Sequence, residues 1–382
     1  MTYHRQPWRE RRTEMARPRG YSTQGDVLVS KSGDGIDLNA IWDEIAQAAA
    51  VYNKHQTALV SLLSFRTTDP GAAVEQGASL PAYERATEFG VPKSIRQGTA
   101  LPVGYDLQDY DLRWASSWKF LRAATAKQIK DLANTAMLAD QKNITATVLN
   151  RLLDPAVSAN ENSTPIFGCW SGTGSMIPPT FMGKAFAANH QHYLVSGATS
   201  LDSEDIEVLS NHVTEHGYGR DAGSRLLILC GPNEADVIAS FRAGQTNNNS
   251  KVAKHDFIPS SAAPPYLTDQ TLVGDRAPDN LGGVPITGSY GRAWVAETPL
   301  MPDGYVAAVV TNGANSALNP IGFREWPAPE YRGLRLIPGV GPYPLQDSFY
   351  QRSFGVGVRH RGAAAILQLK ASGSYDTPTV SV

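Results

Sequence analysis

The histidines are the residues whose spacing comes nearest to metal chemistry. His190 and His192 are separated by one residue, and His212 and His216 stand four apart in a stretch with helical periodicity. An i, i+4 pair places both imidazoles on one helix face, where they could chelate zinc. The intervening Val-Thr-Glu is not a zincin motif, and the last turn of a helix also favours solvated, cationic histidines. The pattern leaves both interpretations open, and we predict no metal site and no cofactor from it.

Other catalytic signatures are incomplete. The glycine-rich stretch 167–175 contains Gly172 and Gly174 but lacks the third glycine of a dinucleotide site and the lysine of a phosphate-binding loop. There is no Gly-x-Ser-x-Gly elbow, and neither Cys169 nor Cys230 lies in a local sequence typical of a nucleophile. We therefore expect that the protein is not an enzyme.

Composition narrows the class of protein further. The 382 residues carry 34 Lys and Arg against 36 Asp and Glu, so no global basic excess indicates nucleic-acid binding. The longest apolar run, residues 305–310, is far shorter than the ~18 residues of a membrane span. Two cysteines are too few for a disulfide framework, and the N-terminal residues lack the apolar core of a signal peptide, which predicts synthesis in the cytosol.

The elements that could position functional groups begin after a basic arm. The first twenty residues hold six arginines and two glutamates, and nothing in them could nucleate a core. Apolar residues at three-to-four spacing then predict a helix over 36–63. Residues 66–116 are interrupted by four prolines and five glycines, with a phase change between Leu107 and Tyr110 that predicts a bulge. Because this segment has too few apolar groups to fold alone, we expect another subunit to receive it.

The strongest helical pattern covers residues 126–153. Thr125 and Gln128 form a capping box before it, Pro155 follows it, and 28 residues at 1.5 Å each span roughly 42 Å. A second helix is predicted over 203–216, a buried strand over 225–230 and another helix from Pro232. Residues 243–280 have the polar composition of a long exposed excursion, short strands follow it, and the last ten residues are predicted to be a loose tail.

Taken in chain order, these features resemble the major capsid proteins of tailed bacteriophages, which share the Hong Kong 97-like fold with encapsulins. The segments most similar to the family are 125–153, 167–176, 201–241, 281–286 and 350–369. None of them is a strict motif, so the resemblance depends on order and spacing. It implies an α+β fold with an N-terminal arm, an extended loop, a peripheral domain with a long spine helix, and an axial domain.

The resemblance also implies a division of the chain. The segments are 1–65 (arm and helix), 66–116 (extended loop), 117–200 (peripheral domain with spine helix 126–153), 201–340 (mostly axial domain, with the polar excursion 243–280) and 341–382 (closing peripheral-domain strand and tail).

The implied function is that of a shell subunit. Copies would self-assemble in the host cytoplasm into the hexamers and pentamers of an icosahedral virion capsid, which encloses double-stranded DNA through non-specific contacts and has no membrane. An encapsulin-type nanocompartment subunit is the alternative, with cargo enzymes in place of DNA and a portal. A soluble cytosolic enzyme is the third reading, and it would require a defined catalytic pocket in residues 170–310.

Contacts and partners follow from the same resemblance. Opposite charges on the extended loop would set the register between neighbouring subunits: Glu75, Glu84, Arg85, Glu88, Lys93 and Arg96. Arginines of the arm would face the interior: Arg5, Arg9, Arg11 and Arg12. No long charged coiled coil precedes the arm, so we expect a separate scaffolding protein, together with a portal and, as an open question, decoration proteins.

The resemblance raises the question of a covalent crosslink between subunits. Some members of the family join a loop lysine to an asparagine near the chain end. Lys93 is the only lysine from His55 through Trp118, but no asparagine occurs after Asn319. We therefore predict that this chain forms no such crosslink.

Overall fold

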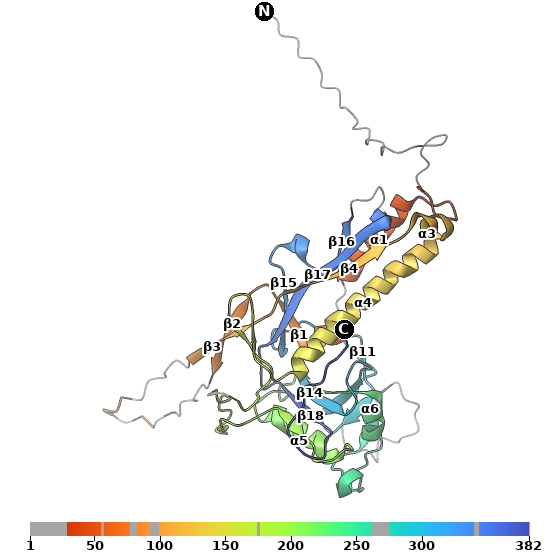
Figure 1. The fold of residues 1–382 in the computed structure, drawn as a ribbon. Coiled ribbons are helices and arrows are strands. Elements are labelled where there is room, and N and C mark those ends of the chain that lie inside the picture. Colours follow the sequence, from red (N-terminus) through yellow and green to blue (C-terminus); the bar gives the residue numbers. More distant parts are fainter. Residues whose placement is uncertain are drawn as a thin grey trace, which may run out of the picture.

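The structure is a computed structural model of the chain. It describes residues 29–54, 57–76, 83, 85–86, 88–91, 99–173, 176–261, 276–339 and 344–381. Helices and sheets are both present: α4 runs beside the sheet that contains β17 and β4, and α5 and α6 lie beside the sheet that contains β14 and β18 (Figure 1). Within these ranges, no helix has both the length and the apolar character needed to cross a bilayer.

The larger sheet has seven strands in the order β7-β18-β14-β8-β13-β12-β9. Their bounds are Tyr193–Val195, Ala364–Gln368, Tyr305–Thr311, Arg225–Cys230, Ala293–Glu297, Gly288–Tyr290 and Phe257–Pro259. The central strands β14 and β8 are almost entirely buried, because α5 and α6 cover one face and the C-terminal half of α4 lies toward the other. The apolar run 225–230 therefore forms the buried strand that its composition predicts, and Cys230 is a core residue.

The second sheet has five strands: four follow the order β1-β15-β17-β16, and β4 pairs with residues 347–354 of the long strand β17, a stretch that includes the residues paired with β16. The bounds are Ser64–Thr67, Ile321–Glu325, Asp347–Val358, Arg335–Pro338 and, for β4, Gln108–Ala115. Three small two-stranded sheets complete the strands: β2 (Gly71–Gln76) with β3 (Thr99–Gly104), β5 (Ser158–Ala159) with β6 (Pro165–Ile166), and β10 (Asn280–Leu281) with β11 (Val284–Pro285).

Six α-helices are described: α1 (Leu38–Lys54), α2 (Ala58–Leu63), α3 (Trp118–Ala123), α4 (Ala126–Leu153), α5 (Ser203–Thr214) and α6 (Pro232–Ala239). Three 3-10 turns are η1 (Asn248–Ser250), η3 (Pro329–Tyr331) and η4 (Pro344–Gln346). The helix predicted over 126–153 is confirmed, including the Thr125–Gln128 capping box. α4 joins two cores, since its N-terminal half packs with α1 and α3 and its C-terminal half packs between the sheets (Figure 1).

Two local predictions are wrong. The helix predicted over 36–63 is two helices, α1 and α2, and Thr57 in a non-helical conformation precedes the second. The bulge predicted between Leu107 and Tyr110 is a strand boundary, because β3 ends at Gly104 and β4 begins at Gln108 in a different sheet. A shift in the alternation of apolar residues is expected both at a β-bulge and at a boundary between two strands. The sequence does not show that the stretches before and after this shift belong to different sheets.

The loop and tail predictions are also wrong in part. Both ends of segment 66–116 fold within the chain itself: β1 pairs in parallel with β15, and β4 pairs with β17 and buries Trp114. At the C-terminus, Val380 is buried and exchanges two hydrogen bonds with the side chain of Asn150 on α4. The final residues described are therefore attached to the spine helix.

The expectation that residues 243–280 form a long exposed excursion is wrong in part. Residues 257–259 form β9 of the seven-stranded sheet, with Phe257 and Ile258 buried, whereas residues 244–252 are mostly exposed but anchored. Asn247, Asn248 and Asn249 each hydrogen-bond to the segment that enters α5, including the Leu201 carbonyl and the Ser203 hydroxyl. The side chains that suggested an exposed loop thus also fix the start of a helix, as short amides do in turns. Residues 262–275 of this segment lie outside the described residues.

Candidate assembly surfaces

A hairpin formed by β2 and β3 extends from the body of the molecule (Figure 1). The strands are antiparallel, with Gly71 opposite Gly104 at the base and Gln76 opposite Thr99 at the outer end. Among the described residues, the two strands form a sheet of their own, with no third strand beside them. An isolated two-stranded hairpin is marginally stable in water, so further contacts must hold this one.

The base of the hairpin is firmly anchored. The Asn160 side chain is buried, donates a hydrogen bond of 2.7 Å to the Pro70 carbonyl, and accepts hydrogen bonds from the backbone N–H groups of Asn162 and Thr164. A Cβ atom added at Gly104 would lie 2.7 Å from the Thr164 carbonyl oxygen, so only glycine permits this close approach. The direction in which the hairpin leaves the body is therefore fixed by the fold.

Beyond the strands, the described residues of the loop present apolar side chains to solvent. The exposed fractions are 106% for Tyr83, 91% for Phe89 and 92% for Val91. Single exposed apolar residues are common on protein surfaces, but three that touch almost nothing in one short loop are not. A surface of this kind indicates a site that another molecule covers.

The charged residues predicted for this loop are described only in part. Arg85 and Glu88 are exposed, and Glu75 lies in β2 with its backbone opposite Ala100. Glu84, Lys93 and Arg96 lie outside the described residues, as do Arg5, Arg9, Arg11 and Arg12 of the arm. Their roles in subunit contacts therefore stay predictions.

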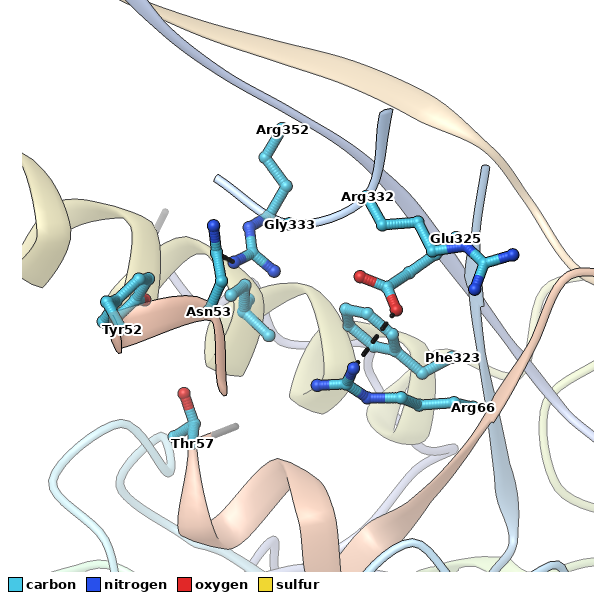
Figure 2. A pocket seen from close by; sticks show the side chains of 10 residues that line it. Tyr52, Asn53, Thr57, Arg66, Phe323, Glu325, Arg332, Gly333 and Arg352 are labelled. Atoms are coloured by element: carbon cyan, nitrogen blue, oxygen red, sulfur yellow. Dashed lines mark hydrogen bonds and ion pairs between the residues drawn. The ribbon is translucent and has the colours of Figure 1, made fainter. Parts of the chain in front are cut away.

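A pocket of about 150 Å³ lies where α1, the β1–β15 pair and the long strand β17 meet (Figure 2). Its lining mixes charged, polar and apolar residues: Tyr52, Asn53, Thr57, Arg66, Ile144, Phe323, Glu325, Arg332, Gly333 and Arg352. Arg66 and Glu325 form an ion pair of 3.6 Å across it. The mixture of charges and the small volume fit a junction between elements better than a substrate site.

A buried ion pair lies beside this pocket and joins α4 to β17. Arg352 Nε is 3.0 Å from Asp140 Oδ1, and both side chains are more than nine-tenths buried. Tyr52 donates a hydrogen bond of 2.9 Å to Asp140 Oδ2, and Arg352 donates one of 3.2 Å to Asn53 Oδ1. Burial raises the pKa of Asp140, and the Arg352 charge opposes that rise. Nothing in the sequence pairs these residues, which stand on elements far apart along the chain.

The histidines lie differently from the sequence-based alternatives. His216 does not pair with His212. It meets His190 and His192, which arrive from the segment before β7. Two sequence signals could have indicated this histidine cluster: the His-x-His before a strand and the histidine at the end of a predicted helix. The sequence does not show that these two segments meet in the fold.

Comparisons with known proteins identify relatives through structure. No family model matches the chain, and no curated protein matches it. A chain of the solved structure of Mycobacterium phage Patience is 39% identical, with a TM-score of 0.70 over 96% of this chain and 97% of that chain. The capsid of an empty GTA particle is 15% identical, with a TM-score of 0.45 over 82% of this chain and 90% of that one. The SrpI encapsulin of Synechococcus elongatus PCC 7942 is 11% identical, with a TM-score of 0.44 over 86% and 97%. The conclusions below use the first of these three similarities, because the other two have TM-scores below 0.5.

Proposed function

The chain belongs to the major capsid proteins of tailed bacteriophages, which have the Hong Kong 97-like fold, and from this we propose that it builds the hexamers and pentamers of an icosahedral shell around a double-stranded DNA genome. It is a structural protein of the virion capsid. The observation that supports the assembly role is the anchored hairpin, whose loop exposes Tyr83, Phe89 and Val91 almost completely.

The hairpin accounts for assembly by burial at a neighbouring copy. Full burial of one large apolar side chain contributes about 1.5–3 kcal/mol, so the three together contribute roughly 5–9 kcal/mol of gross stabilisation at each contact. Ordering the loop and immobilising the subunit offset part of this gain. Because every copy in a closed shell offers the same loop and the same receiving surface, modest contacts sum to a stable particle.

The charged residues of the loop complement this burial. In the proposal, Arg85 and Glu88, with Glu75, Glu84, Lys93 and Arg96, select the register of neighbouring subunits through opposite charges. The arm arginines Arg5, Arg9, Arg11 and Arg12 face the interior and contact DNA without sequence preference. A separate scaffolding protein sets curvature, and a portal occupies one vertex.

The absence of catalysis is part of the proposal. Both cysteines are buried, and burial raises the pKa of each thiol to about 12. Neither thiol is therefore ionised at neutral pH, and an un-ionised buried thiol is a poor nucleophile. The function of the molecule is then the geometry of its contacts.

The test is an assembly assay on loop variants. We expect Phe89→Asp and Val91→Asp to reduce sedimenting particles at least about tenfold, because a charge at either position cannot be buried in an apolar groove without a large cost. Leu318→Asp is the matched control, since Leu318 is also an exposed apolar residue, 58% exposed, but lies far from the loop in the sequence. The proposal is wrong if the loop variants assemble as well as the control.

The contents of native particles separate the two shell functions. Packaged double-stranded DNA with a portal at one vertex supports the virion, and enclosed enzymes with docking tails support a nanocompartment. If the purified chain alone formed uniform shells, the proposed need for a separate scaffolding protein would be wrong. The proposed shell function would not be affected.

A further inference from the structure

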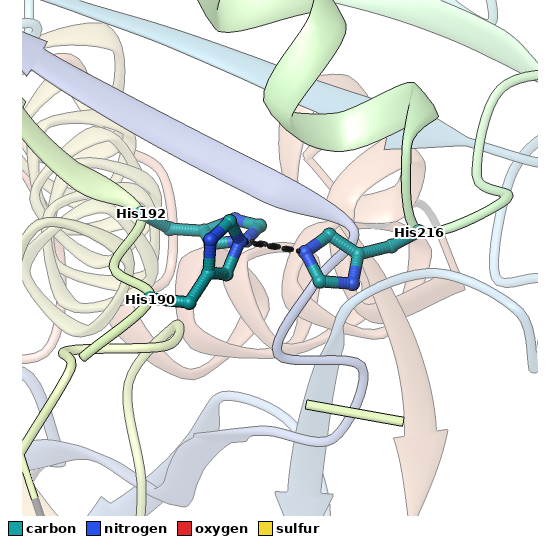
Figure 3. Close-up of side chains that lie close together, drawn as sticks. All are labelled: His190, His192 and His216. Atoms are coloured by element: carbon teal, nitrogen blue, oxygen red, sulfur yellow. Dashed lines mark hydrogen bonds between the residues drawn. The ribbon is translucent and has the colours of Figure 1, made fainter. Parts of the chain in front are cut away.

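Three imidazoles converge at one point between the segment before β7 and the end of α5 (Figure 3). The Nε2 atoms of His190 and His192 are 3.2 Å apart, those of His190 and His216 are 2.9 Å apart, and those of His192 and His216 are 3.0 Å apart. All three rings thus direct the same nitrogen atom toward a common centre. Within the described residues, this is the one group of three histidine, cysteine or carboxylate side chains whose ligand atoms converge in this way.

The fold holds these rings in place. The His192 backbone N–H donates a hydrogen bond of 2.6 Å to the Trp170 carbonyl, and the His192 carbonyl accepts one of 2.7 Å from Ile366 of β18. His216 follows the last turn of α5, and the Phe186 ring stacks on it with centroids 4.0 Å apart. Ligand groups that the backbone and neighbouring rings already hold lose little freedom when they bind an ion.

The hydrogen bonds of His192 determine which nitrogen is free. Its Nδ1 lies 2.6 Å from the Ala364 carbonyl oxygen, which can only accept, so Nδ1 carries the proton and Nε2 presents a lone pair. A hydrogen bond from the second ring nitrogen to a carbonyl is the usual support of a metal-binding histidine. Burial also lowers the pKa of all three imidazoles, which favours the neutral form that binds metals.

Hydrogen bonding among the rings cannot satisfy this arrangement. Each Nε2 offers one in-plane site, which is either a proton or a lone pair. The Nε2 atom of His192 can only accept, and an N–H proton of His190 or His216 can point at only one other nitrogen. At least one of the three short Nε2–Nε2 contacts therefore has no linear hydrogen bond. A cation at the centre would satisfy all three lone pairs together.

The distances match such a cation. A tetrahedral zinc ion with Zn–N bonds of 2.0–2.1 Å separates its nitrogen ligands by about 3.3 Å, a few tenths of an ångström more than the observed spacings. We propose that His190, His192 and His216 bind a zinc ion through their Nε2 atoms. This inference concerns the chain itself and does not depend on the proposed assembly.

The surroundings favour zinc over harder cations. Three imidazoles and no carboxylate oxygen among the converging ligands suit zinc or its transition-metal neighbours, whereas magnesium and calcium prefer oxygen. Glu215 Oε1 lies 3.5 Å from His190 Nε2 and supplies a negative charge beside the site, while its other oxygen forms an ion pair with Lys184. A water molecule or the Glu215 carboxylate is then left to complete the tetrahedron.

The zinc ion would have a structural role and link the segment before β7 to α5. Between β6 and β7 the described chain has no helix and no strand of a named sheet, so few backbone ladders hold it. Zinc would tie the end of that segment to α5 and, through the His192–Ala364 hydrogen bond, to β18. Binding of an ion by the folded state alone raises the stability of that state.

The test measures zinc in the untagged full-length chain. We expect about one zinc per chain by elemental analysis, and X-ray absorption at the zinc edge should show imidazole nitrogens as the main ligands. His216→Gln should lose the zinc and melt at a lower temperature. His212→Gln is the matched control: that ring stacks on His190 with centroids 5.7 Å apart but is not one of the three ligands, so its zinc content should be unchanged.

A measurement on the wild-type chain avoids dependence on the folding of a variant. Removal of metal by a chelator should lower the melting midpoint, and addition of zinc, but not magnesium, should restore it. A chain that holds less than about a tenth of an equivalent after exposure to zinc, with a midpoint that zinc does not change, overturns the proposal. Equal zinc content in His216→Gln and His212→Gln would overturn the ligand assignment.

Discussion

Replacement of Arg352 by Met tests whether the buried ion pair holds the spine helix against β17. The change keeps most of the side-chain volume and removes the charge, so Asp140 would remain buried without its partner. Removal of one member of a buried pair costs about 3–5 kcal/mol of the free energy of unfolding. Because the Arg352–Asp140 contact is close but poorly aligned for a hydrogen bond, we expect a loss near the lower end, about 3 kcal/mol.

The control is Arg113→Met in the neighbouring strand β4. Arg113 Nε is also 3.0 Å from a carboxylate oxygen, that of Asp347, but the side chains are 63% and 34% exposed, against 9% and 6% for Arg352 and Asp140. An exposed pair contributes less than about 1 kcal/mol. The two variants therefore differ in burial while the pair chemistry stays the same.

The assay is chemical unfolding of the full-length chain, followed by fluorescence at a fixed protein concentration. Arg352→Met should lose less stability at acidic pH than at neutral pH, because burial raises the pKa of Asp140 and a protonated carboxyl needs no cation. Asp140→Asn combined with Arg352→Met should cost less than the sum of the two single changes. A loss below about 1 kcal/mol, or one equal to that of Arg113→Met, would refute the reasoning.

Three further predictions concern the hairpin, a helix cap and the covalent state of the shell. Asn160→Ala should cost about 1–3 kcal/mol and speed amide hydrogen exchange in β2 and β3, since it removes three partly buried hydrogen bonds of the buried Asn160 side chain at the hairpin base; unchanged protection there would contradict the anchoring. Burial raises the pKa of Asp205 to about 7 in the folded chain, so this carboxyl contributes a loss of stability as pH rises from about 4 to about 7. Asp205→Asn should remove that contribution, and parallel stability curves for the variant and the wild type over this range would show that Asp205 does not make it. Subunits from denatured native particles should run as monomers in electrophoresis, and mass spectrometry that finds an isopeptide bond at Lys93 would disprove the absence of a crosslink.

Local signals were the part of the fold that the sequence could predict. α4 is confirmed from its first to its last residue because its period, capping box and following proline all lie within one continuous segment. β8 and α6 are confirmed for the same reason, with glycine and proline at their junction. Family resemblance, which depends on the order of these elements, was sufficient for the fold class.

Long-range pairing was not predictable in this way. The parallel pairing of β1 with β15 and the attachment of Val380 to Asn150 join segments that nothing in the sequence marks as neighbours. The same holds for the histidines: His190 and His192 lie in the irregular segment before β7, His216 follows α5, and the packing of α5 on the sheet brings His216 to His192. Functional clusters formed by distant segments leave no periodic pattern to detect.

Reconstruction of the native particle by cryo-electron microscopy tests the central claim most directly, because it shows where the loop between β2 and β3 lies. We predict that Phe89 and Val91, exposed in the single chain, are covered by an adjacent copy within the capsomer. A reconstruction in which both side chains stay in solvent, or lie against their own subunit while neighbouring copies meet elsewhere, would contradict the account.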